Sequence, residues 1–443
     1  MNTPICDFVN KYAHSSALRL HMPGHKGVDV LGVESRDITE ITGADVLYSA
    51  KGIIEESQSN AAALFGSGKT LYSCEGSSLS IRAMLYLAML AGGGKGTILA
   101  ARNAHKVFIS AAALLDFRIE WLYPEEVESI ISCPITAKQV EDKLRSMSEK
   151  PVALYVTSPD YLGNTLDIAG LSKVCHRHGV LLLCDNAHGA YLHFLPESRH
   201  PLDLGADMCA DSAHKTLPVL TGGGYLHIST DAPEVLRENA MRAMSLFAST
   251  SPSYLILQSL DKCNQYLWDG YREKLADCAA RIKELKVALS DKGYELIGDE
   301  PMKVTVATKS YGYTGEELAE ILYSQNIVCE FADPDYVVFM FTPMIKGDGI
   351  EHLQEALLSI PKKNAIKEKA PAVGAPRHVM SVREAVFSPS IVLPVDECEG
   401  RILASENVSC PPAIPIVVCG ERIDKSAIEV LKYYGITECR VVK

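Results

Sequence analysis

Short apolar stretches that alternate with helical stretches are the feature that most limits how this 443-residue chain can fold. VALYVT from Val152 and VLLLCD from Val180 are apolar throughout, and GYLHIS from Gly224 is a further candidate strand. Strands that are apolar on both faces need cover on both faces, and strands separated by helices usually pair in parallel. The pattern therefore predicts an α/β fold with a mainly parallel sheet between layers of helices.

One predicted helix begins with a turn of small polar residues. The segment GSSLSIRAMLYLAML opens at Gly76, Ser77 and Ser78, and Gly92–Gly94 ends it. A Gly-Ser-Ser turn at a helix N-terminus offers free N–H groups, two hydroxyls and the positive end of the helix dipole, which suit a phosphate group. Taken alone, the same turn is explained by helix capping.

The length of the chain suits two or three domains, each with a buried core. The stretch PKKNAIKEKAPAVGAP is rich in Lys, Ala and Pro and has the composition of a linker. We expect an N-terminal arm over 1–50, a large cofactor-binding domain over 51–265, a small α/β domain over 266–360, the linker over 361–378 and a C-terminal domain over 379–443.

The predicted arm contains LHMPGHKG at Leu20–Gly27, where proline and glycine exclude a regular element. His21 and His25 have no Cys, Asp or Glu at ligand spacing, so no metal site is predicted there. The 13 cysteines of the chain are scattered without CxxC pairs and are typical of reduced thiols rather than of a disulfide framework or a zinc site.

The charge balance, 43 Lys and Arg against 55 Asp and Glu, gives a net charge of −12. This argues against nucleic acid or an anionic membrane as the partner and is compatible with a cationic small substrate, although an acidic surface also simply aids solubility. The stretch MNTPICDFVNKYAHSS has no basic segment followed by an apolar one, so no signal peptide is expected, and the uncharged apolar run Ala83–Gly94 is too short to span a bilayer. A cytoplasmic protein is expected.

The stretch DSAHKTLPVLTGGG, Asp211–Gly224, places Lys215 in a polar run that interrupts apolar sequence. A lysine used for carbonyl chemistry needs a cofactor, and upstream the strand LLLCD ends on Asp185. The pair suggests pyridoxal phosphate, with Lys215 as the Schiff-base lysine and Asp185 facing the pyridine nitrogen. Each residue alone would be interpreted as a solvated side chain. His105 follows another strand, and ligands of such sheets bind at the carboxyl ends of the strands.

Several motifs occur in the order and approximate spacing of a known family. They are LHMPGHKG, EGSSLSIRAM, ARNAHK, TSPDYLG, CDNAHGA, SAHKTLP, REAVF, EGRILAS and PPAIPIVVCGERI. Over nearly its whole length the chain resembles the short form of the ornithine/lysine/arginine decarboxylase family. The resemblance implies the pyridoxal-phosphate fold of the aspartate-aminotransferase type, usually a homodimer or higher homo-oligomer with active sites at the subunit interface.

The resemblance also implies a role for each site residue. Lys215 would hold the cofactor, Asp185 would keep the ring nitrogen protonated and His105 would stack on the ring. Loss of CO2 leaves a carbanion at Cα, which a protonated pyridinium can stabilise, and Lys215 or its neighbour His214 could return a proton. The residues implied for the phosphate group are Gly76, Ser77, Ser78, Ser212 and His214.

Three residues depart from the family pattern or extend it. His188 lies beside the cofactor position where larger members carry an aromatic residue, so it is a candidate for recognising the distal group of the substrate. Glu75 precedes the phosphate turn, where a carboxylate is unfavourable unless it points away. Glu421 resembles an acidic residue that meets the substrate's distal cation, although a glutamate in a tail is more often solvated.

These observations predict a pyridoxal-phosphate-dependent decarboxylase that converts arginine, lysine or ornithine into a polyamine or its precursor. An aminotransferase or another amino-acid lyase on the same fold would need an arginine for the α-carboxylate, and Met302–Ser359 contains none. A silent cofactor-binding protein would not need both Lys215 and Asp185. One methylene is worth only about 1–3 kcal/mol in a pocket, so the substrate stays open, with arginine favoured by family analogy.

Overall fold

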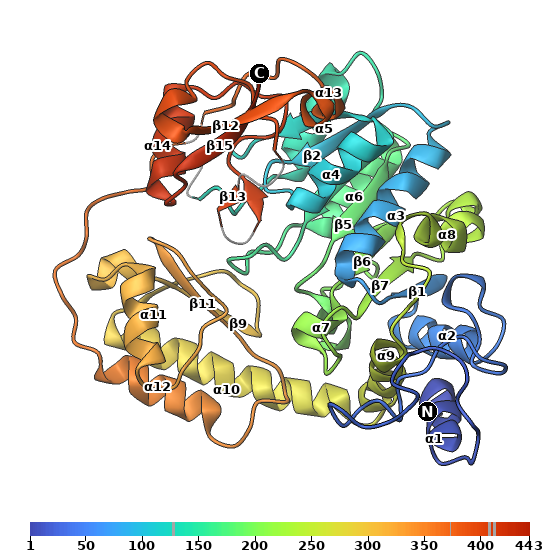
Figure 1. The fold of residues 1–443 in the computed structure, drawn as a ribbon. Helices are drawn as coiled ribbons and strands as arrows, with labels where there is room; N and C mark the ends of the chain where they lie inside the picture. The colour runs from blue at the N-terminus through green and yellow to red at the C-terminus, as the bar shows by residue number, and fades with distance from the viewer. Residues whose placement is uncertain (126–128, 373, 406–408, 411–412) are drawn as a thin grey trace. The chain divides into compact units, whose positions relative to one another are not determined.

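The computed structural model describes residues 1–125, 129–372, 374–405, 409–410 and 413–443. The chain divides into two compact units, each made of two segments. The first unit is Met1–Gly94 with Ile168–Leu275, and the second is Lys95–Asp167 with Ala276–Lys443. Figure 1 shows the elements by label.

The strands of the first unit pair in the order β1 (Lys69–Ser73), β7 (Gly224–Ile228), β6 (Met208–Asp211) and β5 (Leu181–Asp185). β5 and β6 are parallel, whereas β7 is antiparallel to both β6 and β1. The connection between β6 and β7 holds only the short helix α7 (Ala213–Thr216) and a turn, not a crossover helix across a sheet face. β7 therefore departs from the parallel pattern.

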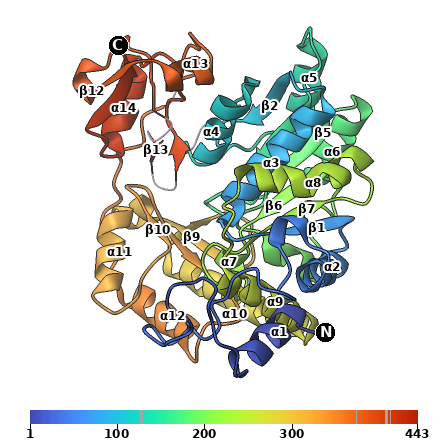
Figure 2. The ribbon, with the colours of Figure 1, turned by 45° about the vertical axis from the view of Figure 1, so that its right-hand side comes forward.

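Helices cover the strands of this unit. The apolar helix predicted from Gly76 is confirmed as α3 (Gly76–Ala91), and it lies beside α8 (Glu234–Phe247) in both views (Figures 1 and 2). The segment with LHMPGHKG is irregular, as predicted. The remaining longer helices are α1 (Pro4–Ala13), α2 (Ile53–Phe65), α6 (Ile168–Arg177) and α9 (Tyr254–Trp268).

The second unit contains a parallel group of strands, β3 (Arg118–Leu122), β2 (Thr97–Ala101) and β4 (Ala153–Thr157), with α4 (Lys106–Leu115) and α5 (Ala137–Ser146). A separate antiparallel sheet has the order β10 (Phe331–Ala332), β11 (Tyr336–Met340), β9 (Lys303–Ala307) and β8 (Glu295–Ile297). This small α/β part also contains α11 (Gly315–Tyr323), α12 (Gly349–Ser359) and, from Ala276 onward, α10 (Tyr271–Lys292).

The C-terminal part of the second unit has its own apolar core, which includes Val395, Cys398, Leu403, Val417 and Ile423. Residues 361–376 form no helix or strand where the structure describes them, as expected of a linker. Pro411 and Pro412 of the motif PPAIPIVVCGERI lie outside the described residues. The elements are α13 (Val382–Phe387), β12 (Ser390–Pro394), β13 (Ser409–Cys410), β14 (Ile414–Pro415), α14 (Lys425–Tyr433) and β15 (Glu438–Val442).

Among the described residues, no helix combines the length and the apolar character needed to cross a bilayer. The predicted domain boundaries stay a prediction.

The triple glycine before β7 permits close packing of several segments in the first unit. A Cβ added at Gly224 would lie 2.9 Å from the Asp211 carbonyl oxygen and 3.0 Å from the carbonyl carbon of Gly76. The Gly76 N–H donates to the Gly222 carbonyl at 2.6 Å, and Gly76 itself has a φ of 66°. These contacts hold the start of β7 against the end of β6 and the first turn of α3.

We expect Gly224→Ala to destabilise the protein by about 1–3 kcal/mol, because the new methyl group meets backbone atoms that cannot move independently. Gly24→Ala is the matched control, since nothing lies within 4 Å of its added Cβ and its φ is not positive. Urea unfolding of both variants measures the difference. Equal unfolding midpoints would contradict this account of the glycine.

Candidate functional site

Lys215 lies in α7, directly after β6, and its amine contacts the imidazole of His188. Nζ of Lys215 is 2.9 Å from Nε2 of His188. His188 is buried and follows the end of β5, whereas Lys215 is half-buried. Because β5 and β6 are parallel neighbours, the segments that follow them meet at one edge. The structure thus brings together two predicted site residues that are 27 positions apart in the sequence.

Asp185 is the last residue of β5 and is only 2% exposed. Its Oδ1 lies 3.3 Å from the backbone N–H of Ala187, which donates to it. A buried carboxylate favours positive charge in its surroundings, because burial otherwise penalises its ionised form. Asp185 therefore suits a cationic ring nitrogen at this end of the strand.

The two serines expected at a phosphate group are in direct contact. The Ser212 hydroxyl donates to Ser77 Oγ at 2.8 Å, from the residue before α7 to the first turn of α3. Glu75, at the N-cap of α3, makes no side-chain cap. Its Oε1 instead accepts a hydrogen bond of 2.7 Å from the Ser249 N–H. The carboxylate therefore points away from the turn, and the N–H groups of the first turn of α3 suit an anion.

His214 is fixed by the glycine turn that precedes β7. Its Nδ1 donates to the Gly223 carbonyl at 2.9 Å, which places the proton of a neutral imidazole on Nδ1 and leaves Nε2 as the acceptor. A Cβ added at Gly76 would lie 3.7 Å from His214 Cε1, so the ring borders the turn that opens α3. Ser78, in the same turn, is half-buried.

His105 belongs to the second unit, where it is the N-cap residue of α4. Its Nδ1 accepts from the Val107 N–H at 3.2 Å, which satisfies one free donor of the helix. This local role was not expected from the sequence. The predicted stacking of His105 on a cofactor ring stays a prediction.

Glu421, also in the second unit, is buried and ion-paired rather than solvated. It is 1% exposed, and its Oε2 accepts from the Val418 N–H at 2.7 Å and from Arg102 Nη2 at 3.2 Å. Burial raises the pKa of Glu421, and the Arg102 charge opposes that shift. The expected contact of Glu421 with a substrate cation stays a prediction.

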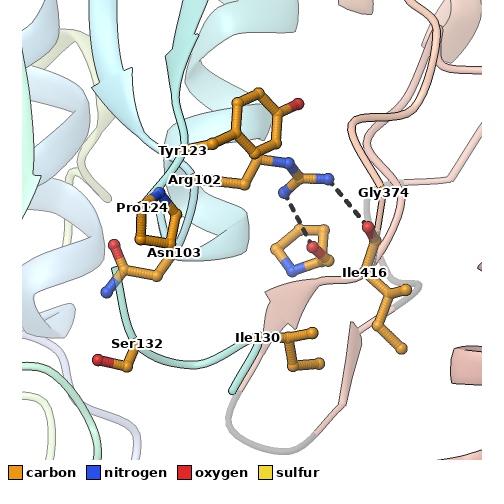
Figure 3. Close-up of a pocket in the computed structure, with 9 residues that line it drawn as sticks. Arg102, Asn103, Tyr123, Pro124, Ile130, Ser132, Gly374 and Ile416 are labelled. Carbon is orange, nitrogen blue, oxygen red and sulfur yellow. Dashed lines mark hydrogen bonds between the residues drawn. The ribbon is translucent and has the colours of Figure 1, made fainter. Parts of the chain in front are cut away.

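The side chain of Arg102 also binds backbone carbonyl groups in the C-terminal part of the second unit. The two terminal nitrogens of its guanidinium donate to the carbonyls of Pro415, at 3.0 Å, and Ile416, at 2.9 Å. Figure 3 shows both bonds beside a pocket that Tyr123 and Pro124 help to line. Because these bonds join the residue after β2 to the backbone around β14, this arginine acts as a structural clamp.

A buried polar cluster around Asp211 was not expected from the sequence. The Asn186 side-chain amide donates to Asp211 Oδ1 at 2.8 Å, and His200 Nε2 lies 3.0 Å from Oδ2. Asp211 directly precedes Ser212, and Asn186 directly follows Asp185. The cluster therefore connects the two stretches that carry the predicted site. The sequence did carry a signal of this cluster, because Asn186 directly follows the apolar strand β5 and Asp211 is the polar last residue of the apolar strand β6.

Comparison with known proteins places these features in context. The family model for the major domain of Orn/Lys/Arg decarboxylase matches residues 3–298, and the model for the C-terminal domain matches 367–440. An arginine decarboxylase of Bacillus subtilis (strain 168) is 30% identical, with 96% of this chain and 92% of that protein covered.

Solved structures agree on the fold. The lysine decarboxylase LdcF of Francisella novicida superposes with a TM-score of 0.82 at 17% identity, covering 100% of this chain and 81% of that one. A structure of SPT with PLP superposes with a TM-score of 0.54 at 14% identity, covering 69% and 75%. The predicted fold class is confirmed: a mixed α/β fold with a large, mainly parallel sheet and a C-terminal domain.

We expect Arg102→Met to destabilise the second unit by about 3–5 kcal/mol, because it leaves the carboxylate of Glu421 buried without its cation. The control is Arg118→Met, which breaks an ion pair with Glu149 in which both side chains are about two-thirds exposed and should change stability little. Urea unfolding, with hydrogen exchange of residues 417–431, measures both effects. The clamp assignment fails if the two variants unfold alike.

Proposed function

Because the chain belongs to the Orn/Lys/Arg decarboxylase family, we propose that it removes the α-carboxyl group of a basic amino acid with pyridoxal phosphate as its cofactor. The products are CO2 and the corresponding amine. The observation that carries the proposal is the contact of Lys215 with His188 at the strand end beside buried Asp185. A lysine amine, an imidazole and a carboxylate at one sheet edge are the groups that this chemistry needs.

The residues of the first unit fit the proposed cofactor in three respects. Lys215 supplies an amine for its aldehyde carbon, and Asp185 supplies a buried negative charge for its ring nitrogen. The Ser77 and Ser212 hydroxyls, at the N-terminus of α3, supply polar partners for its phosphate. The Glu75 carboxylate, which would repel a phosphate, is bound to Ser249 instead.

When bound, pyridoxal phosphate supplies an electron sink for the electron pair left at Cα as CO2 departs. Asp185 favours the protonated ring nitrogen, because its buried carboxylate is stabilised by a nearby positive charge. His188 accepts a hydrogen bond from Nζ and so orients the Lys215 amine. Two groups on α7 can hold the proton that Cα receives. One is the Lys215 amine, and the other is Nε2 of His214, whose Nδ1 donates a hydrogen bond to the Gly223 carbonyl.

We propose arginine as the substrate ahead of lysine and ornithine. The support is the name of the Bacillus subtilis relative, an arginine decarboxylase that aligns with 96% of this chain. The net charge of −12 favours a cationic substrate of any of the three kinds. The lysine decarboxylase LdcF shares the fold at 17% identity, and a likeness at that identity does not indicate which substrate side chain this protein recognises.

The reaction is tested by incubating the cofactor-loaded protein with arginine, lysine and ornithine and measuring agmatine, cadaverine and putrescine by mass spectrometry. We expect agmatine to dominate. Lys215→Ala should lower the rate at least ~10³-fold, because it removes both the attachment point and a proton carrier. Lys173→Ala, an exposed lysine of α6, is the control and should keep full activity.

Amine formation that is equal in Lys215→Ala and the wild type would refute the role of the lysine. Release of a keto acid in place of an amine would indicate an aminotransferase.

The phosphate assignment has its own test, the equilibrium dissociation constant of the cofactor. We expect Ser77→Ala and Ser212→Ala each to raise it about 5–10-fold, since each removes roughly one hydrogen bond. The double variant should lose less than the product of the two effects, because the hydroxyls contact each other at 2.8 Å. Ser245→Ala, exposed on α8, is the control. Unchanged binding in both single variants would remove these serines from the site.

A further inference from the structure

Two carboxyl groups of the second unit are buried, and one oxygen of each has no donor. Asp333 and Asp335 lie on either side of Pro334 in the turn between β10 and β11. Asp333 is 3% exposed, and the side chain of Asp335 is 15% exposed. Among the residues that the structure describes, Oδ2 of each aspartate is buried without a hydrogen-bond partner. The turn contains none of the residues proposed for the cofactor.

The other oxygen of each aspartate is held firmly. Oδ1 of Asp333 accepts the N–H of Asp335 at 2.8 Å and the N–H of Tyr336 at 2.7 Å, which fixes the plane of this carboxyl group. Oδ1 of Asp335 accepts the hydroxyl of Tyr433 at 2.7 Å and lies 3.0 Å from Nζ of Lys309. Both acids therefore have a defined orientation.

The contacts of this turn join the small sheet to the C-terminal part of the second unit. Tyr433 is the last residue of α14, whereas Lys309 belongs to the short helix η3 (Thr308–Tyr311) beside the turn. The next residue, Tyr434, packs against an apolar cluster that includes Phe331 of β10. The end of α14 thus covers the hairpin that contains both aspartates.

Charged and titratable groups surround Asp333 from every element packed against the turn. They are Asp335 in the turn itself, Glu316 in α11, Lys309 in η3, Tyr433 in α14 and Glu368 in the segment after α12. Burial, together with the negative charges of Asp335 and Glu316, raises the pKa of Asp333 to about 7, although its two backbone hydrogen bonds act in the opposite direction.

We propose that Asp333 is protonated while α14 is docked, and that loss of this proton weakens the docking of the C-terminal part. A buried carboxylate oxygen without a donor is unfavourable, whereas a protonated one bears a hydroxyl and no charge. Ionisation would add a second negative charge beside Asp335, whose own charge is already matched by Lys309. The turn then acts as a pH-sensitive joint.

The direction of the pH effect follows from the proton that the docked state holds. Opening of α14 exposes the turn to water, where an ordinary aspartate ionises near pH ~4. Between that value and the raised pKa of about 7, the docked state binds a proton that the opened state releases. Docking is therefore strongest at acidic pH and weakens as the pH rises through about 7. This inference does not depend on the proposed decarboxylation.

Hydrogen exchange of the full-length protein at about pH 6 and about pH 8, corrected for the intrinsic exchange rate at each pH, tests the proposal. We expect the protection factors of α14, Lys425–Tyr433, to fall about tenfold, because the docked state loses its proton over this range. Asp333→Asn keeps the acceptor oxygen and places an N–H where the acid holds its proton. In this variant α14 should be equally protected at both pH values.

Glu320→Gln is the matched control, since it removes an exposed carboxylate from α11 and should leave the pH effect intact. Equal protection of α14 at both pH values in the wild type would overturn the proposal, and this result needs no variant to fold. A pH effect that persists in Asp333→Asn would overturn it as well. So would a fall of the same size in α3 of the first unit, because the effect would then not arise at this turn.

Discussion

The parallel pairing of β5 with β6 is the constraint on which the candidate site depends. In this register Asp185 lies opposite Ala210, so the residues that follow the two strands emerge at the same edge. His188 comes from one connection and Lys215 from the other, and their contact at 2.9 Å is a consequence. The antiparallel β7 then returns beside β6 and brings the glycine turn, and with it the first turn of α3, to the same place.

Local sequence was enough to predict the parts of the site that sit at strand and helix ends. An apolar strand that ends abruptly on an aspartate, and a polar run that surrounds Lys215, are visible without a structure. The apolar helix from Gly76 and the irregular segment LHMPGHKG follow from composition and from glycine and proline in the same way. These features depend on contacts between residues that are close in the chain.

The features that the sequence did not predict depend on pairing over long separations. Glu421 was expected to be solvated or to meet a substrate, but its partner Arg102 is 319 positions away and buries it in an ion pair. The buried cluster of Asn186, His200 and Asp211 has no recognisable spacing in the sequence, because the pairing of β5 with β6 and the loop before β6 bring these side chains together. The antiparallel direction of β7 was not predicted either. It follows from the connection between β6 and β7, which holds only α7 and a turn and has no helix that could cross a face of the sheet.

The contact of Lys215 with His188 also bears on what the protein does before it meets any ligand. The imidazole accepts an N–H of the amine, so the contact fixes the direction of Nζ and leaves the lone pair of a neutral amine available to attack a carbonyl. The lysine is therefore oriented before any ligand arrives, and its half-buried position limits the directions from which a carbonyl can approach it.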